Sequence, residues 1–110
     1  ALPILGQLND ALQTLGKEAP GYMKSFMGFI EQAEKGGALS TKTKELISVA
    51  LGVTAHCQPC IAFHVKGAID AGATRQEILE AGMVAGMMGG GPGVAHLMYV
   101  LHACDQFGAK

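Results

Sequence analysis

The sequence predicts an all-α domain of about six helices, and three observations favour this fold class. Apolar residues recur at spacings of three and four along most of the chain. Residues that favour helix starts and helix ends separate these stretches. Only one short stretch alternates like a strand, and it has no partner strands with which to form a sheet. The 110 residues match the usual length of one domain, so we expect residues 1–110 to form a single unit.

Two amphipathic stretches predict the first two helices. The first is marked by a stripe of leucines: Leu5, Leu8, Leu12 and Leu15. Gly16 and Pro20 interrupt it. The second stretch continues the same period: Tyr22, Phe26, Phe29, Ile30 and Ala33. Gly36 and Gly37 follow, and we expect them to supply a left-handed cap at the helix C-terminus.

The next two helices are predicted from their boundaries. Ser40 or Thr41 can cap a third helix over residues 42–55, because a hydroxyl oxygen accepts from the free amides of a first turn. Pro59 is favourable in a first helical turn, so we expect a fourth helix to begin near it and to stop at Gly72.

A capping box and a glycine run define the last two helices. Thr74 and Glu77 have the spacing of a capping box, which opens a fifth helix that runs through Met88. The glycine-rich segment 89–93 is predicted to be a turn. Pro92 can then open a sixth helix that reaches about Phe107.

The alternating stretch is residues 47–54, and it offers a rival interpretation. A strand followed by two cysteines and a helix is the thioredoxin arrangement. A thioredoxin-like sheet needs further strands, however, and the segments on both sides carry helical patterns. We therefore expect residues 47–54 to be helical.

The composition limits the classes of partner. With 49% hydrophobic residues, 15% charged residues and a mean hydropathy of +0.28, the chain is unusually apolar for a small monomer, and we expect a homo-oligomer. The net charge is −1 and there is no basic run, so nucleic acid is not an expected partner.

Two uncharged stretches, residues 46–65 and 81–104, have the length of a membrane helix. Each contains proline, histidine or glycine near its middle, so we expect two shorter buried helices in each and no membrane partner. The chain as given shows no signal-peptide pattern. The expected location is cytoplasmic.

Cys57, Cys60 and His64 carry the chemistry that the sequence predicts. Their spacings of three and four place them on one side of a first helical turn. The two cysteines can close into a disulfide there. Free amides at the helix start favour a Cys60 thiolate, and His64 can take the thiol proton. These features describe an activated nucleophile beside a resolving partner.

The two cysteines allow other interpretations. They could be two small buried thiols in an apolar core. With His64 they could bind zinc, with a fourth ligand drawn from Glu45, His56, His96 or His102, although no second knuckle of ligands is present. Covalent haem attachment is excluded, because Ile61 follows the second cysteine where a histidine is required.

The pattern resembles the carboxymuconolactone decarboxylase superfamily, in particular its alkylhydroperoxidase D-like branch. That branch carries a glutamate, a Cys-x-x-Cys pair beginning twelve residues later, and a histidine four residues after the second cysteine. Glu45, Cys57, Cys60 and His64 match it position by position. The glycine-proline turn before the last helix is also similar, and the resemblance spans residues 39–107.

The resemblance implies an alkylhydroperoxidase D-like helical fold, a homo-trimer or homo-hexamer, and a peroxidase or disulfide reductase cycle. By that analogy Cys60 attacks a hydroperoxide, Cys57 resolves the product to a disulfide, and an external dithiol, lipoyl or thioredoxin-like, restores both thiols. His64 and Glu45 form the proton relay. The cycle requires no cofactor and no metal. The alternatives are a zinc-binding or redox-sensing oligomer without turnover, and a carboxymuconolactone decarboxylase-like enzyme.

This chain departs from the branch at one position. The best-known peroxidases carry a histidine just before the second cysteine, where this chain has Pro59, so their full efficiency is not carried over. His56 could partly replace the missing group. His96 and His102 are interpreted as packing or interface residues and Cys104 as a buried apolar residue. Decarboxylase members act without the paired cysteines, so the redox branch fits better.

Overall fold

The computed structural model describes residues 2–110, and every regular element in that range is a helix. The helices are α1 (Leu2–Glu18), α2 (Pro20–Glu34), α3 (Thr41–Thr54), α4 (Gln58–Asp70) and α5 (Arg75–Phe107). The all-α prediction is confirmed, including residues 47–54, which belong to α3.

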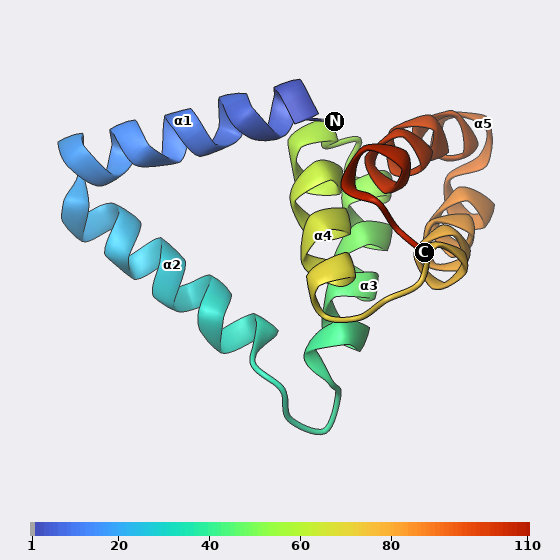
Figure 1. The fold of residues 1–110 in the computed structure, drawn as a ribbon, viewed down its shortest axis with the longest axis horizontal. Coiled ribbons are helices and arrows are strands. Elements are labelled where there is room, and N and C mark those ends of the chain that lie inside the picture. Colours follow the sequence, from blue (N-terminus) through green and yellow to red (C-terminus); the bar gives the residue numbers. More distant parts are fainter. Residues whose placement is uncertain (1) are drawn as a thin grey trace.

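Helices α3, α4 and α5 form the packed body of the molecule (Figure 1). Apolar side chains from all three meet in one core, and the largest fully buried ones are Ile61, Ile78, Val49, Val53, Val65, Val100 and Cys104. This core fixes α4 between its neighbours, and so it fixes the helix that carries both cysteines.

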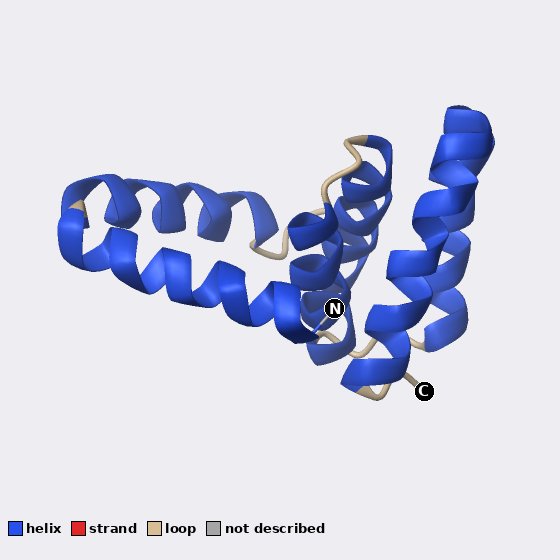
Figure 2. Ribbon diagram, turned by 90° about the horizontal axis from the view of Figure 1, so that it is seen from above, coloured by secondary structure: helices blue, strands red, loops and turns tan. Residues whose placement is uncertain are grey.

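Helices α1 and α2 form an arm that extends away from the body (Figures 1 and 2). The arm packs back on the body where α1 meets α4 and where α2 meets α3. Several large apolar side chains of the arm stay exposed, among them Tyr22, Phe26, Met27 and Phe29. The arm therefore has apolar surface that this chain alone does not cover.

The predicted caps are present at two helix starts, and one predicted cap is wrong. Ser40 caps α3 by accepting from the Thr43 amide, and Thr74 with Glu77 forms the expected capping box of α5. Gly36 and Gly37 do not form a left-handed cap. Helix α2 ends at Glu34 because Lys35 turns extended (φ −58°, ψ 133°), and neither glycine has a positive φ.

The predicted fifth and sixth helices are the two halves of α5. The halves meet at Gly90, whose φ of 67° and ψ of −148° are not helical, and there the chain reverses so that they lie side by side (Figures 1 and 2). Small residues allow this close packing. A Cβ on Gly82 would lie 2.9 Å from the Leu97 side chain, and one on Gly93 would lie 3.3 Å from the Gly86 Cα.

The two uncharged stretches are divided as expected. Residues 46–65 span the turn between α3 and α4, and residues 81–104 span the reversal at Gly90. Among the described residues, no helix is both long enough and apolar enough to cross a membrane.

Candidate active site

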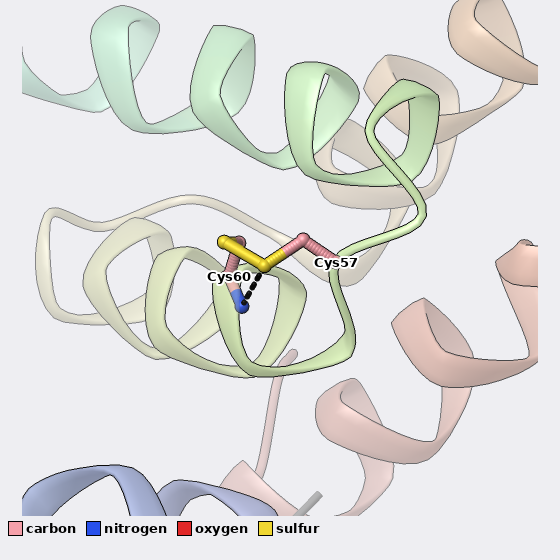
Figure 3. The surroundings of a disulfide bond; sticks show 2 residues. All are labelled: Cys57 and Cys60. Atoms are coloured by element: carbon pink, nitrogen blue, oxygen red, sulfur yellow. Dashed lines mark hydrogen bonds between the residues drawn. A yellow bond between two sulfur atoms is a disulfide. The ribbon is translucent and has the colours of Figure 1, made fainter. Parts of the chain in front are cut away.

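The start of α4 holds a disulfide between Cys57 and Cys60 (Figure 3). The helix begins one residue before Pro59, so Cys57 is its N-cap and Cys60 lies in its first turn. Their Cα atoms are 5.2 Å apart. The Cys60 amide donates a hydrogen bond to Cys57 Sγ at 3.2 Å. Cys60 is exposed and Cys57 is half-buried, so an external molecule reaches Cys60 more easily.

His64 lies one turn after Cys60 and contacts Glu45 of α3. Its Nδ1 is 3.1 Å from Glu45 Oε1, which means that Nδ1–H donates to the carboxylate and that Nε2 is left free to exchange a proton. Glu45 is 6% exposed. The structure thus brings together the four residues that the spacing pattern selected, although their catalytic role stays a prediction.

Gly67 makes room for the Glu45 carboxylate. A Cβ at this position would overlap Glu45 Oε2, one turn of α4 beyond His64. Gly67 could not be recognised from the sequence, because a glycine inside a helical pattern indicates only that some neighbour is close. Here the neighbour is the buried acid of the candidate relay.

Glu45 is ionised in this setting. Burial raises the pKa of Glu45, but the hydrogen bonds that His64 and Glu34 make with its carboxyl group outweigh burial and lower the pKa. A buried carboxylate that keeps its charge can hold the imidazole ring in one tautomer.

A second carboxyl group, Glu34 of α2, joins this pair. One oxygen from each carboxyl group and a ring nitrogen of His64 all lie within 4.8 Å of one another. Burial, and then the adjacent Glu45 carboxylate, raise the pKa of Glu34. Sequence reasoning missed this residue. The available indication is that an acid stands at the C-terminus of a helix, where the helix dipole disfavours its charge.

An apolar pocket of about 280 Å³ lies over the disulfide. Cys57, Cys60 and His64 are on its wall. The other wall comes from the arm and from neighbouring residues of α4: Leu8, Leu12, Phe26, Met27, Ile30, Pro59 and Phe63. A molecule that binds there would contact hydrocarbon on one side and the sulfur atoms on the other.

A separate hollow of about 410 Å³ lies on the other side of the relay, and Glu34 and Glu45 are on its wall together with Lys66 and Asp70. Phe63 lines both this hollow and the apolar pocket. A larger hollow of about 540 Å³ between α1 and α2 contains no cysteine, histidine or acidic residue, so we do not assign chemistry to it.

The remaining histidines lie outside the Glu45–His64 pair. His56 has a positive φ of 53° and stacks on His96, with the ring centres 4.3 Å apart. His96 Nδ1 lies 2.9 Å from the Pro92 carbonyl oxygen, and His102 is exposed on α5. Cys104 is buried in the core, as expected. None of them takes part in the Glu45–His64 hydrogen bond.

The zinc alternative needs thiolates, and in this structure the two sulfur atoms are bonded to each other. The Glu34, Glu45 and His64 group is better described as a hydrogen-bonded acid network, because the His64 nitrogen that faces the carboxylates is already used as a donor. We assign neither group to a metal.

Comparison with known proteins identifies the family and the fold. A sequence model of the carboxymuconolactone decarboxylase family matches residues 20–103. The chain belongs to this family. A carboxymuconolactone decarboxylase family protein from Legionella pneumophila has the same fold, with a TM-score of 0.91 and 39% identity over 94% of this chain and 93% of that one. A family protein from Thermotoga maritima shares the fold at 24% identity, with a TM-score of 0.81 over 93% and 87% of the two chains.

Sequence relatives in this family are less informative about activity. An uncharacterised protein from Cupriavidus necator is 37% identical over 96% of this chain and 90% of its own length. An uncharacterised protein encoded in the cox locus of Paracoccus denitrificans is 44% identical over 64% of this chain and 63% of its own length. Neither relative has an assigned activity, so the reaction has to be argued from the site.

Proposed function

We propose that this protein is a thiol-dependent oxidoreductase that reduces hydroperoxides through Cys57 and Cys60. The observation that carries the proposal is the disulfide at the start of α4, which shares one pocket with a histidine hydrogen-bonded to a buried carboxylate. A role in an antioxidative response has been suggested for the Thermotoga maritima protein, and at 24% identity that likeness contributes the fold alone.

In the first step the Cys60 thiolate attacks the terminal oxygen of a hydroperoxide. The S–O bond forms and the O–O bond breaks, so Cys60 is oxidised to a sulfenic acid while the hydroperoxide is reduced to an alkoxide. His64, which has taken the thiol proton, returns it to the alkoxide. Cys60 suits the nucleophile's role because it is the more exposed sulfur and lies in the first turn of α4.

In the second step Cys57 resolves the sulfenic acid. His64, neutral again after the first step, takes the Cys57 proton; the Cys57 thiolate attacks Cys60 Sγ, the S–S bond forms, the S–O bond breaks, and the departing hydroxide takes that proton from His64 to give water. In the disulfide the two Cα atoms are 5.2 Å apart, a separation within the usual range for this bond. An external dithiol then supplies two electrons and two protons and becomes a disulfide itself.

The proposed substrate class follows from the pocket. Its walls are apolar except at the sulfur atoms and His64, and its volume of about 280 Å³ suits a small organic group. We therefore expect an organic hydroperoxide such as cumene hydroperoxide to react faster than hydrogen peroxide, because only the organic compound gains from the hydrocarbon walls.

The experiment that tests the proposal counts thiols. Reduced, chelator-treated protein is mixed with one equivalent of hydroperoxide, unfolded in denaturant and titrated for thiols, and the modified cysteines are located by mass spectrometry. We expect the count to fall from three to one, with Cys57 and Cys60 joined and both recovered by a dithiol.

Two variants make the count specific. Cys60→Ser should stop hydroperoxide consumption, whereas Cys104→Ala should leave it unchanged, because Cys104 is buried away from the pocket. Survival of all three thiols in the wild type, or full consumption by Cys60→Ser, would show that the proposed chemistry is wrong.

A further inference from the structure

Glu34 lies where an acid is poorly placed unless it keeps a proton. It is the last residue of α2, at the negative end of the helix dipole, and it sits beside the buried Glu45 carboxylate. Its Oε2 is buried, and no hydrogen-bond partner for that atom lies in the described part of the chain. Two carboxyl groups at this separation disfavour double ionisation, because like charges repel most strongly where water is excluded.

Counting donors around Glu34 leads to the same conclusion. Ser48 Oγ lies 3.1 Å from Glu34 Oε1 and 2.9 Å from the Lys44 carbonyl oxygen. One hydroxyl has a single hydrogen for these two acceptors. The ring hydrogen of His64 is already used by Glu45. The acceptor atoms around Glu34 therefore outnumber the hydrogens available to them, and a proton on Glu34 would supply one more donor.

The charged groups around Glu34 do not remove the need for that proton. On α3, the Lys44 ammonium donates to the Lys35 carbonyl, and Glu45 is an anion. On α4, Lys66 is paired with Asp70 at 2.8 Å, and His64 is paired with Glu45. Of α1, Leu5 and Asn9 line the shared hollow, and neither carries a charge. No cation is paired with Glu34 among the described residues.

We propose that Glu34 is a positioning residue of the relay, which holds a proton at pH values where an ordinary glutamate has lost its own and so keeps Glu45 ionised and aligned on His64. The role in turnover rests on the proposed redox function. The protonated state itself does not.

The hollow beside Glu34 gives this proton a route to solvent that is separate from the apolar pocket. Cys57, Cys60 and His64 face the apolar pocket, whereas Glu34 and Glu45 face the other hollow, which Lys66 and Asp70 also line. A substrate that fills the apolar pocket excludes water from the sulfur side. Glu34 can still exchange its proton with solvent on the opposite side, and Glu45 passes the change in charge to His64.

The protonated state is tested by NMR titration of the side-chain carboxyl carbons of ¹³C-labelled glutamate in the oxidised, chelator-treated protein. We expect one glutamate resonance to titrate above the ordinary range, to vanish in Glu34→Gln and to survive in Glu31→Gln, an exposed acid three residues earlier on α2. If no wild-type resonance titrates high, or if the high one survives in Glu34→Gln, the inference is wrong.

The link to the relay is tested on the reduced protein by the pH dependence of Cys60 alkylation with iodoacetamide. Ionisation of Glu34 places a negative charge near His64 and so makes His64 a better acceptor of the thiol proton. The wild-type rate should therefore contain an additional step that Glu34→Gln loses and Glu34→Asp retains. A wild-type profile in Glu34→Gln would overturn the inference.

This pair of measurements separates the two proposals. If wild-type protein fails to consume hydroperoxide but keeps the high glutamate titration and the alkylation step, the peroxidase proposal fails and the role of Glu34 stands. If hydroperoxide is consumed and neither feature appears, Glu34 is not part of the relay. Should Glu34→Gln fail to fold, the wild-type titration and Glu34→Asp still decide the question.

Discussion

At the scale of single residues, the proposed chemistry depends on one hydrogen bond between two helices. His64 can exchange a proton at Nε2 only while Nδ1 is held by Glu45. Glu45 is buried, so its charge is tolerated because the hydrogen bonds with His64 and then with Glu34 offset the cost of burial. Each residue of the pair therefore stabilises the state that the other needs.

This dependence predicts how stability responds to acid. The pKa of Glu45 is below its ordinary value of 4.5 in the folded chain, so the stability from its ionised form is present above about pH 4.5 and is lost as pH falls through the lower folded value. Glu45→Gln should lower the free energy of unfolding by about 1–3 kcal/mol at neutral pH. It should also reduce the loss of stability at acidic pH, as measured by urea unfolding over a range of pH values. Glu31→Gln is the control. If Glu45→Gln lost stability at acidic pH as steeply as the wild type, the prediction would be contradicted.

The residues of the site differ in how far the sequence could predict them. The two cysteines and His64 could be predicted because they share one helix start, whereas Glu45 was predicted only from the resemblance to a known family. Glu34 was not found, because its contact with Glu45 depends on how the arm returns to the body. Such a tertiary contact leaves no periodic pattern, and only the poor fit of an acid at a helix end indicated it.

At the scale of helices, Gly67 of α4 leaves the space that the Glu45 carboxylate of α3 occupies. Gly67→Ala would normally favour a helix by about 0.5–1 kcal/mol. Here the methyl group would displace the Glu45 carboxylate, so we expect lower stability, a loss of roughly 1.5–3 kcal/mol with the charged hydrogen bond, and slower hydroperoxide consumption. Urea unfolding measures the stability, and a hydroperoxide assay measures the rate of consumption.

Gly28→Ala is the matched control for this prediction. Gly28 is a glycine inside α2 and has nothing within 4 Å of the position a Cβ would take. It should gain stability and leave activity unchanged. If Gly67→Ala behaved in the same way as Gly28→Ala, Glu45 would not need the space that Gly67 provides.

Helix boundaries were predictable where a side chain makes the cap and less so where the backbone does. Ser40 and Thr74 act through their own oxygen atoms, and both were identified. The end of α2 is set by the backbone of Lys35, whose side chain gives no indication of it. The reversal in α5 was located because only glycine readily adopts the backbone angles of Gly90.

At the scale of the whole molecule, the exposed apolar surface predicts self-association. Phe29 of the arm is 74% exposed, and Met88 of α5 is 79% exposed. Further exposed apolar side chains of α5 are Met83, Val84, Met87, Val94 and Met98. We expect light scattering after size exclusion to give a mass several times the 11.4 kDa of one chain, and Met88→Lys to lower it. A monomer at micromolar concentration would contradict this.

The global arrangement was the least predictable level. The leucine stripe indicated that the first helix buries one face, and the sequence could not show that this face would cover the sulfur atoms of a distant helix. The apolar pocket is assembled from α1, α2 and α4, so its volume and chemistry emerge only when the chain is folded.

The burial of Cys104 has a practical consequence. The side chain is 1% exposed, and desolvation raises the pKa of its thiol, so an alkylating reagent can reach it only when the core opens. In protein whose other two cysteines are joined, the rate at which this one sulfur is labelled would measure how often the fold opens under native conditions. The chain thus contains its own reporter of conformational fluctuation, and no dye or engineered probe is needed to read it.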